Sequence, residues 1–216
     1  MYIELVDSLR CLEPHEETWL VAAVTRMDGR HIAEGKLGCP VCRREYAVRA
    51  GVGWFSRQQP GAVEPSLTTA GVETDESRIL RAGALLGLGE AGGIVVLGGA
   101  WTACANAVTG FGAAHAIVLN VQVTDASPQE VSSLVVDDRL PFGIGALRAV
   151  ALDAALAATP LLTSAAAALR SRGRLVAPAD APVPEGVAVV ARDEIDWVGE
   201  RVAVASPPVP LRSARR

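Results

Sequence analysis

Two cysteines separated by two residues constrain the amino-terminal part of this chain more than any other feature. Cys39 and Cys42 flank the dipeptide Pro40-Val41, and two thiolates with this spacing on a tight turn converge on one tetrahedral metal ion. Cys11 and His15 lie upstream, where they can supply a third and a fourth ligand. The sequence therefore predicts a closed Cys3His zinc site with a structural role.

The same residues allow other interpretations. Cys39 and Cys42 are also compatible with small buried side chains of a tight turn, or with a redox pair. A redox pair of this spacing normally opens a helix in a βαβ unit, whereas residues 43–48 alternate as in a strand. A metal site is therefore favoured over a redox site. His31 is either a surface residue or a replacement for His15 as the fourth ligand.

The composition is that of a globular chain and excludes some classes of function. Of the 216 residues, 50% are hydrophobic and 20% are charged, and the net charge is -4. The bulk charge therefore does not favour direct binding to nucleic acid. Residues 1–10 carry Glu4 and Asp7 in an apolar run, which predicts neither a secretory signal nor membrane insertion. We expect a cytoplasmic protein, with Cys104 as a buried apolar residue.

The sequence pattern divides the chain into four segments. Residues 1–58 contain brief alternating runs separated by glycines, which predicts a small zinc-ribbon-like module that needs a metal ion to fold. Residues 59–73 contain two prolines and a glycine without periodicity and are expected to be a linker. Residues 74–205 alternate between helical and strand patterns, and residues 206–216 form a Pro- and Arg-rich flexible tail.

The second segment predicts an α/β fold with a mainly parallel sheet. Apolar runs predict buried strands at residues 93–97, 116–121, 134–136, 149–152 and 174–177. Helical spacing and capping residues predict helices over 74–88, over 101–108, from Ser127, and from Thr159 to Gly173. A closing hairpin is expected from residues 187–190 and 201–205, with its turn around Trp197, Val198 and Gly199.

The amino-terminal motif resembles a known family. The resemblance is to the small zinc-ribbon proteins that bind and activate tRNA and release-factor methyltransferases. It rests on Leu9-Arg10-Cys11, Pro14-His15, Gly38-Cys39-Pro40-Val41-Cys42, Tyr46 and Gly51-Val52. Because this module is too small to bury Trp19, Trp54 and Phe55 together, we expect some of them to pack on the second segment or on a partner.

The second segment resembles a class I S-adenosylmethionine-dependent methyltransferase. In that family the stretch matching residues 94–103 binds the methionine part of the cofactor, and an aspartate with a Leu-Pro-Phe run flanks the adenine. Here these are Asp138 and Leu140-Pro141-Phe142. The stretch from Leu169 to Val176 matches the family's helix-to-strand passage. The resemblance implies a Rossmann-like fold of the methyltransferase type.

The sequence departs from that family at the expected cofactor site. Gly99 keeps a glycine that lets the backbone approach the ligand, but Leu97 replaces an acidic residue and Trp101 replaces a second glycine. The second strand should end in a carboxylate that accepts both ribose hydroxyls, and Asn120 offers only one acceptor oxygen. These departures predict that S-adenosylmethionine does not bind with useful affinity.

The expected function is therefore non-catalytic. The chain is predicted to be a scaffold or an activating partner of another protein, for example of an active methyltransferase. One rival is an active S-adenosylmethionine-dependent methyltransferase, with Gly99, Asn120 and Asp138 as cofactor contacts. Another is a fold retained for self-association into a homo-oligomer or a larger assembly.

Overall fold

The computed structural model describes five parts of the chain, residues 1–57, 76–89, 92–112, 115–121 and 130–202. The predicted linker at 59–73, the tail at 206–216 and the predicted helix start at Ser127 lie outside the described residues. Among the described helices, none has the length and hydropathy needed to cross a membrane.

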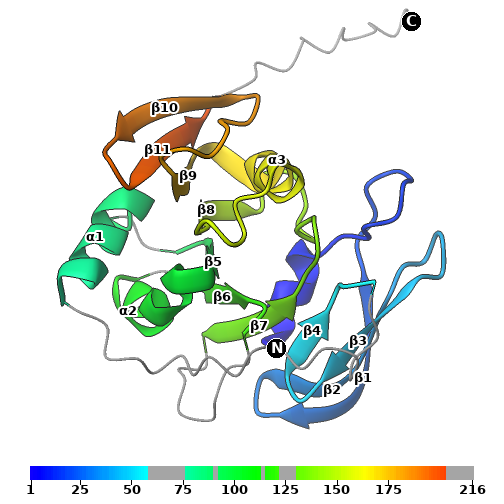
Figure 1. The fold of residues 1–216 in the computed structure, drawn as a ribbon. Helices are drawn as coiled ribbons and strands as arrows, with labels where there is room; N and C mark the ends of the chain where they lie inside the picture. The colour runs from blue at the N-terminus through cyan, green and yellow to red at the C-terminus, as the bar shows by residue number, and fades with distance from the viewer. Residues whose placement is uncertain (58–75, 90–91, 113–114, 122–129, 203–216) are drawn as a thin grey trace, which may run out of the picture.

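One sheet of 11 strands runs through the molecule (Figure 1). Its strand order is β1-β2-β3-β4-β7-β6-β5-β8-β9-β11-β10. The parallel centre consists of β7 (Val131–Val135), β6 (His115–Leu119), β5 (Ile94–Gly98), β8 (Leu147–Ala151) and β9 (Leu169–Pro178). Two antiparallel strands follow at one side, β11 (Asp196–Arg201) and β10 (Val187–Arg192). The predicted fold class, a Rossmann-like α/β fold of the methyltransferase type with a mainly parallel central sheet, is confirmed.

Helices cover the two faces of the parallel strands. On one face lie α1 (Glu76–Leu86), the 3-10 helix η2 (Gly99–Cys104) and α2 (Ala105–Gly110), and on the other lies α3 (Thr159–Ala168). Side chains of β5 alternate between these layers, because Val96 packs in the α3 cluster while Val95 and Leu97 pack in the α1 and α2 cluster. This double burial explains why the strand is apolar at every position.

The amino-terminal part forms an antiparallel meander that extends the same sheet. It consists of η1 (Ile3–Ser8), β1 (Val21–Asp28), β2 (His31–Gly38), β3 (Glu45–Arg49) and β4 (Val52–Trp54). Strand β4 pairs in parallel with β7, and the Phe55 N–H continues the ladder by donating to the Val135 carbonyl oxygen at 2.8 Å. The predicted zinc-ribbon-like module and the methyltransferase-like segment therefore share one sheet within the chain.

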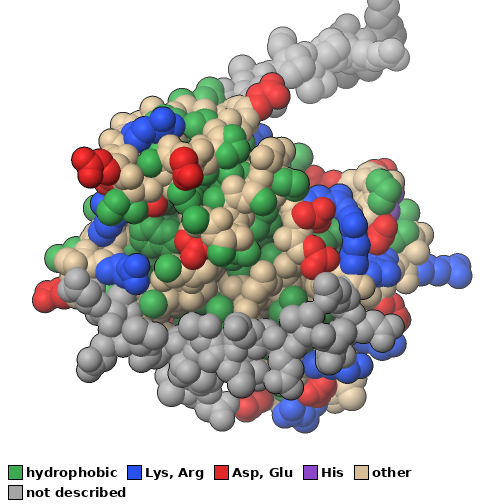
Figure 2. Space-filling model, in the orientation of Figure 1, with side chains coloured by type: hydrophobic (Ala, Val, Ile, Leu, Met, Phe, Trp, Pro, Cys, Tyr) green, Lys and Arg blue, Asp and Glu red, His purple; other side chains and the backbone are tan. Residues whose placement is uncertain are grey.

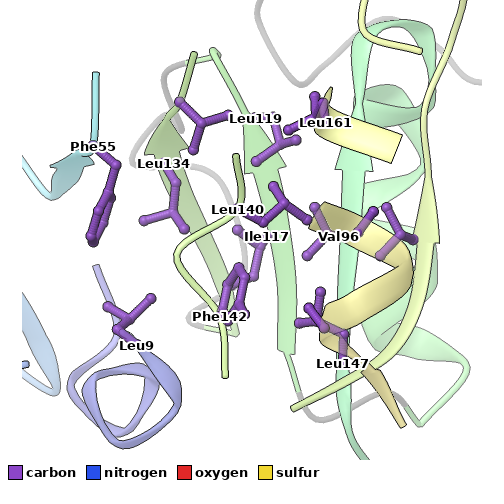
Figure 3. Packing of buried hydrophobic residues seen from close by; sticks show 14 of the residues in the cluster. Leu9, Phe55, Val96, Ile117, Leu119, Leu134, Leu140, Phe142, Leu147 and Leu161 are labelled. Atoms are coloured by element: carbon purple, nitrogen blue, oxygen red, sulfur yellow. The ribbon is translucent and has the colours of Figure 1, made fainter. Parts of the chain in front are cut away.

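The hydrophobic core crosses this junction. Figure 3 shows Phe55 and Leu9 on the side of Leu134 and Phe142, and Phe55 is only 3% exposed. The expectation that an aromatic side chain of the module packs on the second segment is confirmed for Phe55. Trp19 behaves differently, because it is 57% exposed and lies beneath the Arg10 guanidinium.

Two predicted boundaries near the carboxyl-terminal end of the sheet are wrong. The helix predicted to reach Gly173 ends at Ala168, because Leu169 already pairs with Leu147 of β8. The Ala- and Leu-rich composition suits a helix and a buried strand equally well, so it does not mark this change. The predicted hairpin turn at Trp197 lies inside β11, and the second hairpin strand is 196–201 rather than 201–205.

Three other elements differ in extent from the sequence prediction. Strand β7 begins at Val131, so a helix starting at Ser127 does not continue beyond residue 130. Strand β6 ends at Leu119 because Asn120 has a φ of 58°, which breaks the extended conformation. The first part of the helix predicted over 101–108 is 3-10 helix.

The close approach of β4 to β7 predicts a specific stability effect at Gly53. A Cβ atom there would lie 2.8 Å from Leu134 Cδ2 and 3.2 Å from Met1 Sδ. We expect Gly53→Ala to lower the free energy of unfolding by about 1–3 kcal/mol through overpacking. The measurement is urea-induced unfolding. Gly110→Ala is the control, because a Cβ atom at Gly110 meets nothing within 4 Å. Equal stability of the two variants would contradict the junction described here.

Candidate metal centre and cofactor cradle

The four predicted metal ligands come together at one end of the amino-terminal meander. Cys11 and His15 lie between η1 and β1, and Cys39 and Cys42 lie in the connection from β2 to β3. Their four ligand atoms all lie within 4.8 Å of one another. Two separate loops of the meander thus supply two ligands each, in an arrangement that can hold a metal ion.

The distances within the cluster fit a tetrahedral zinc ion. Zinc bonds of ordinary length place two sulfur ligands roughly 3.8 Å apart, and a sulfur and a nitrogen ligand roughly 3.5 Å apart. The Cys11 and Cys42 Sγ atoms are separated by 3.6 Å, and the Cys39 Sγ atom is 3.4 Å from His15 Nε2. The donor set has the chemistry of a structural zinc site, three thiols and one imidazole.

The backbone and a tyrosine orient these ligands. The Nδ1–H of His15 donates to the Glu16 carbonyl oxygen at 2.7 Å, which leaves the Nε2 lone pair directed at the cluster. Tyr46 Oη accepts the Leu12 N–H at 2.9 Å and lies 3.4 Å from Cys11 Sγ. Burial, together with the hydrogen bond to Cys11, raises the pKa of Tyr46, which therefore stays a neutral donor to the sulfur.

The turn that carries Cys39 promotes ionisation of its thiol. Burial alone would raise the Cys39 pKa, but the N–H groups of Cys42 and Val41 and the two neighbouring thiols outweigh it and lower that pKa to about 7. The turn closes with a hydrogen bond from the Arg43 N–H to the Cys39 carbonyl oxygen, and Arg43 adopts a φ of 61°. A thiolate is the form that binds a metal ion. His31 begins β2 next to Tyr2, outside this group of ligand atoms.

The residues expected to hold a cofactor, here called the cofactor cradle, are Gly99, Asn120, Asp138 and the run 140–142. Gly99 follows β5 with a φ of 63°. An ideal Cβ atom on Gly99 would collide with the carboxylate of Asp153. That carboxylate also accepts the Ala100 N–H at 2.8 Å. The group closest to the glycine is therefore a side chain of the protein itself.

Asn120 also has a partner within the chain. Its Oδ1 atom accepts the Val136 N–H at 2.9 Å, and its own N–H donates to the Leu134 carbonyl oxygen. The side chain thus ties the end of β6 to the residue that follows β7. The amide oxygen of Asn120 is the one acceptor that the family resemblance would place at the ribose. It is engaged in the contact with Val136.

The loop predicted to flank an adenine contacts the amino-terminal module. The Arg10 N–H donates to the Pro141 carbonyl oxygen at 2.9 Å, and Leu9 pairs with Phe142 as an isolated bridge. Asp138 remains half exposed, with Oδ2 3.9 Å from the Arg57 guanidinium. The loop is therefore held between the module and α3, where Ser164 Oγ accepts the Leu140 N–H.

Leu97 and Trp101, the two bulky residues that depart from the family pattern, lie on the face of the sheet covered by α1 and α2. Leu97 and Trp101 are buried in the cluster under α1 and α2, with Trp101 only 8% exposed. Asp153, rather than Trp101, is the group that approaches Gly99. Cys104, predicted to be a buried apolar residue, is fully buried in the same cluster.

Fold and site together define a methyltransferase-like α/β protein with a Cys/His cluster that can hold a metal ion. No protein-family model matches the chain, and no curated protein matches it significantly. Among solved structures, it resembles an S-adenosylmethionine-dependent methyltransferase from Mesorhizobium loti, with 19% identity over 55% of this chain and 73% of that chain and a TM-score of 0.32.

A second solved structure is that of a protein from Bacillus halodurans C-125, assigned provisionally as a methyltransferase. It shares 17% identity over 48% of this chain and 49% of its own, with a TM-score of 0.37. The chain thus matches about half the length of the Bacillus protein. Similarities this distant do not indicate what activity the chain has.

Two contacts of the site were missed in the sequence. Asp153 is the second residue after β8, and a carboxylate near the carboxyl end of a parallel strand is a signal that could have drawn attention to it. Tyr46 was noted only as part of the motif, and its role depends on how β3 packs against Cys11. No spacing rule reveals that contact.

The cluster predicts bound zinc that depends on Cys39. We expect metal analysis of protein purified without chelator to give one zinc per chain, and Cys39→Ser to lose most of it because three ligands hold the ion far less tightly. Cys104→Ser is the matched control, because Cys104 is buried away from the cluster. Zinc-free wild-type protein would contradict the site, whereas full zinc in His15→Ala would contradict only the fourth ligand.

Proposed function

We propose that this protein is a non-catalytic scaffold or activating partner of another protein. In this proposal the metal is a structural zinc ion, and the methyltransferase-like segment does not bind S-adenosylmethionine. The observation that carries the proposal is the position of the Asp153 carboxylate against Gly99 and the Ala100 N–H. A cofactor carboxylate would need the same space and the same kind of donor.

Displacing Asp153 is costly for an incoming ligand. Its carboxylate accepts two N–H groups, those of Ala100 at 2.8 Å and Ala155 at 3.0 Å. Hydrogen bonds to a charged group are worth roughly 1.5–3 kcal/mol each. Micromolar binding corresponds to only about 8 kcal/mol in total. Opening the space beside Gly99 would therefore break the hydrogen bond from the Ala100 N–H and lower the affinity for a cofactor.

The rest of the cofactor cradle supports the same conclusion. The Asn120 amide oxygen is engaged with the Val136 N–H, and the run 140–142 is held by Leu9, Arg10 and Ser164. Each of these groups serves a contact inside the protein instead of facing a ligand. Of these contacts, those of the run 140–142 with Leu9 and Arg10 join the two segments of the chain.

The outer strand β1 supports a role as a binding partner. It is the first strand of the sheet order, so one of its backbone edges has no neighbouring strand among the described residues. Its exposed side chains include Val21, Val24 and Met27, which are 62%, 40% and 40% exposed. An apolar strand edge of this kind is a template for association with another chain.

Calorimetric titration with S-adenosylhomocysteine tests the non-catalytic function. We expect no heat of binding, and no rise in melting temperature, at concentrations that saturate ordinary methyltransferases. The physical reason is the competition with Asp153 and the loss of the ribose contact at Asn120. An active methyltransferase titrated in parallel is the positive control.

Micromolar binding of the ligand would overturn this proposal. It would favour the rival function, an active methyltransferase with Gly99, Asn120 and Asp138 at the cofactor. In that case Asp153→Ala should raise the affinity, because it removes the competing carboxylate.

A further inference from the structure

A second site lies at the opposite end of the parallel strands. A cavity of about 530 Å³ opens where β8 and β9 begin, beside the end of α1. Its polar lining consists of Arg148, Arg170, Ser171, Arg172, Arg174 and Glu200. Among the described residues that line it, four are arginines and one is a glutamate. The cofactor cradle, by contrast, lies at the carboxyl ends of these strands.

A bulge in β9 places two of these arginines. Leu147 pairs with Leu169 and Ala149 with Arg174, so two steps along β8 are matched by five along β9. The three extra residues turn outward and carry Arg170 and Arg172 to the cavity. Gly173 permits this turn, because a Cβ atom there would lie 2.8 Å from the Arg170 carbonyl oxygen. Bulges often place side chains at functional sites.

The other two arginines are held rigidly. Arg148 is only 3% exposed and donates to the carbonyl oxygens of Gly92 and Gly87 at 2.7 and 2.8 Å. Arg174 donates to Glu200 at 3.2 Å and to the Ala84 carbonyl oxygen at 2.9 Å. These contacts pair Arg174 with Glu200 and fix the cavity wall. A wall fixed in this way lowers the entropic cost of binding a ligand.

The backbone at Arg172 is strained. Its φ of 60° lies in the left-handed region, which is unfavourable for a non-glycine residue and readily adopted by glycine. Arg172 is exposed, and it has no ion pair with any residue that the structure describes. Neither packing nor backbone geometry therefore explains an arginine here, but its side chain adds a positive charge at the cavity.

We propose that this cavity binds a small molecule that carries two or more linked phosphate groups. Guanidinium groups match phosphate oxygens in geometry and charge, and several of them together favour a ligand with several negative charges. The cavity volume falls in the range of small-molecule sites. The same chemistry is offered by a nucleoside triphosphate and by inorganic triphosphate. This proposal does not depend on the proposed scaffold function.

The surface charge favours a small ligand over a nucleic-acid strand. On the face shown in Figure 2, basic and acidic side chains are interspersed in small groups and do not form one extended basic area. The net charge of -4 also opposes association with a long polyanion. A compact phosphate group can instead use a local concentration of arginines.

Calorimetric titration with ATP and with inorganic triphosphate, in the absence of magnesium, tests the proposal. We expect saturable binding of one ligand per chain, weakened by added salt because the contacts are electrostatic. Equal affinities would identify the phosphate chain as the recognised group, and tighter binding of ATP would identify a nucleotide. Both results support recognition of linked phosphate groups by the cavity.

Two variants separate binding from stability. We expect Arg172→Gly to weaken binding about tenfold, the loss of roughly one charged contact, while its melting temperature stays the same or rises because glycine relieves the strain. Arg170→Ala should weaken binding to a similar extent. Arg192→Ala is the matched control, because Arg192 is an exposed arginine of β10 outside the cavity lining.

Three results would overturn the proposal. The first is no binding of either phosphate compound by the wild-type protein. The second is unchanged affinity in both Arg172→Gly and Arg170→Ala. The third is tighter binding of a single-stranded oligonucleotide than of ATP, which would assign the arginines to a nucleic acid.

Discussion

The parallel pairing of β4 with β7 is the interaction on which the rest of the arrangement depends. Strand β4 has only three residues, and its module cannot bury Trp54 and Phe55 by itself. Pairing with β7 satisfies the backbone of both strands and brings Phe55 into the core next to Leu134. The same junction brings residues 8–10 against the loop at 141–143. The metal cluster then lies at the end of a meander that is anchored in the main sheet.

Much of the fold could be predicted from the sequence because its strands are buried on both faces. The continuous apolar runs at β5, β6 and β8 have no other stable location than the centre of a covered sheet. The start of β9 could not be predicted, because Ala165 to Leu169 suit a helix as well as a strand. Its boundary is decided by pairing with β8, which is a contact between residues distant in sequence.

In the site, too, features set by local spacing were predictable, and contacts between residues distant in sequence were not. The pairing of Cys39 with Cys42 was predictable, since Cys-x2-Cys spacing is a local property of one turn, whereas Cys11 and His15 come from a separate loop. The contact of Asp153 with Gly99 was not predictable, because it requires the loop after β8 to bend over the end of β5. From the sequence, the predicted loss of cofactor binding was attributed to the bulk of Trp101, to Leu97 and to Asn120. The Trp101 side chain lies under α1 and α2, and the nearer obstacle is the carboxylate.

The two ends of the parallel sheet differ in what their side chains contact. Stability of the sheet comes from the apolar layers on its faces, and these layers place no demand on the residues at the strand ends. At the carboxyl end, Asp153, Asn120 and the loop at 140–142 are engaged with the chain's own backbone. At the amino end, the bulge of β9 holds Arg172 in a strained backbone conformation beside a cavity whose described lining includes four arginines and one glutamate. Strain persists only where the surrounding structure enforces it, and here the ladder on both sides of the bulge does so. We therefore propose ligand binding at the end of the sheet where the backbone of Arg172 is strained, rather than at the end with the familiar motif.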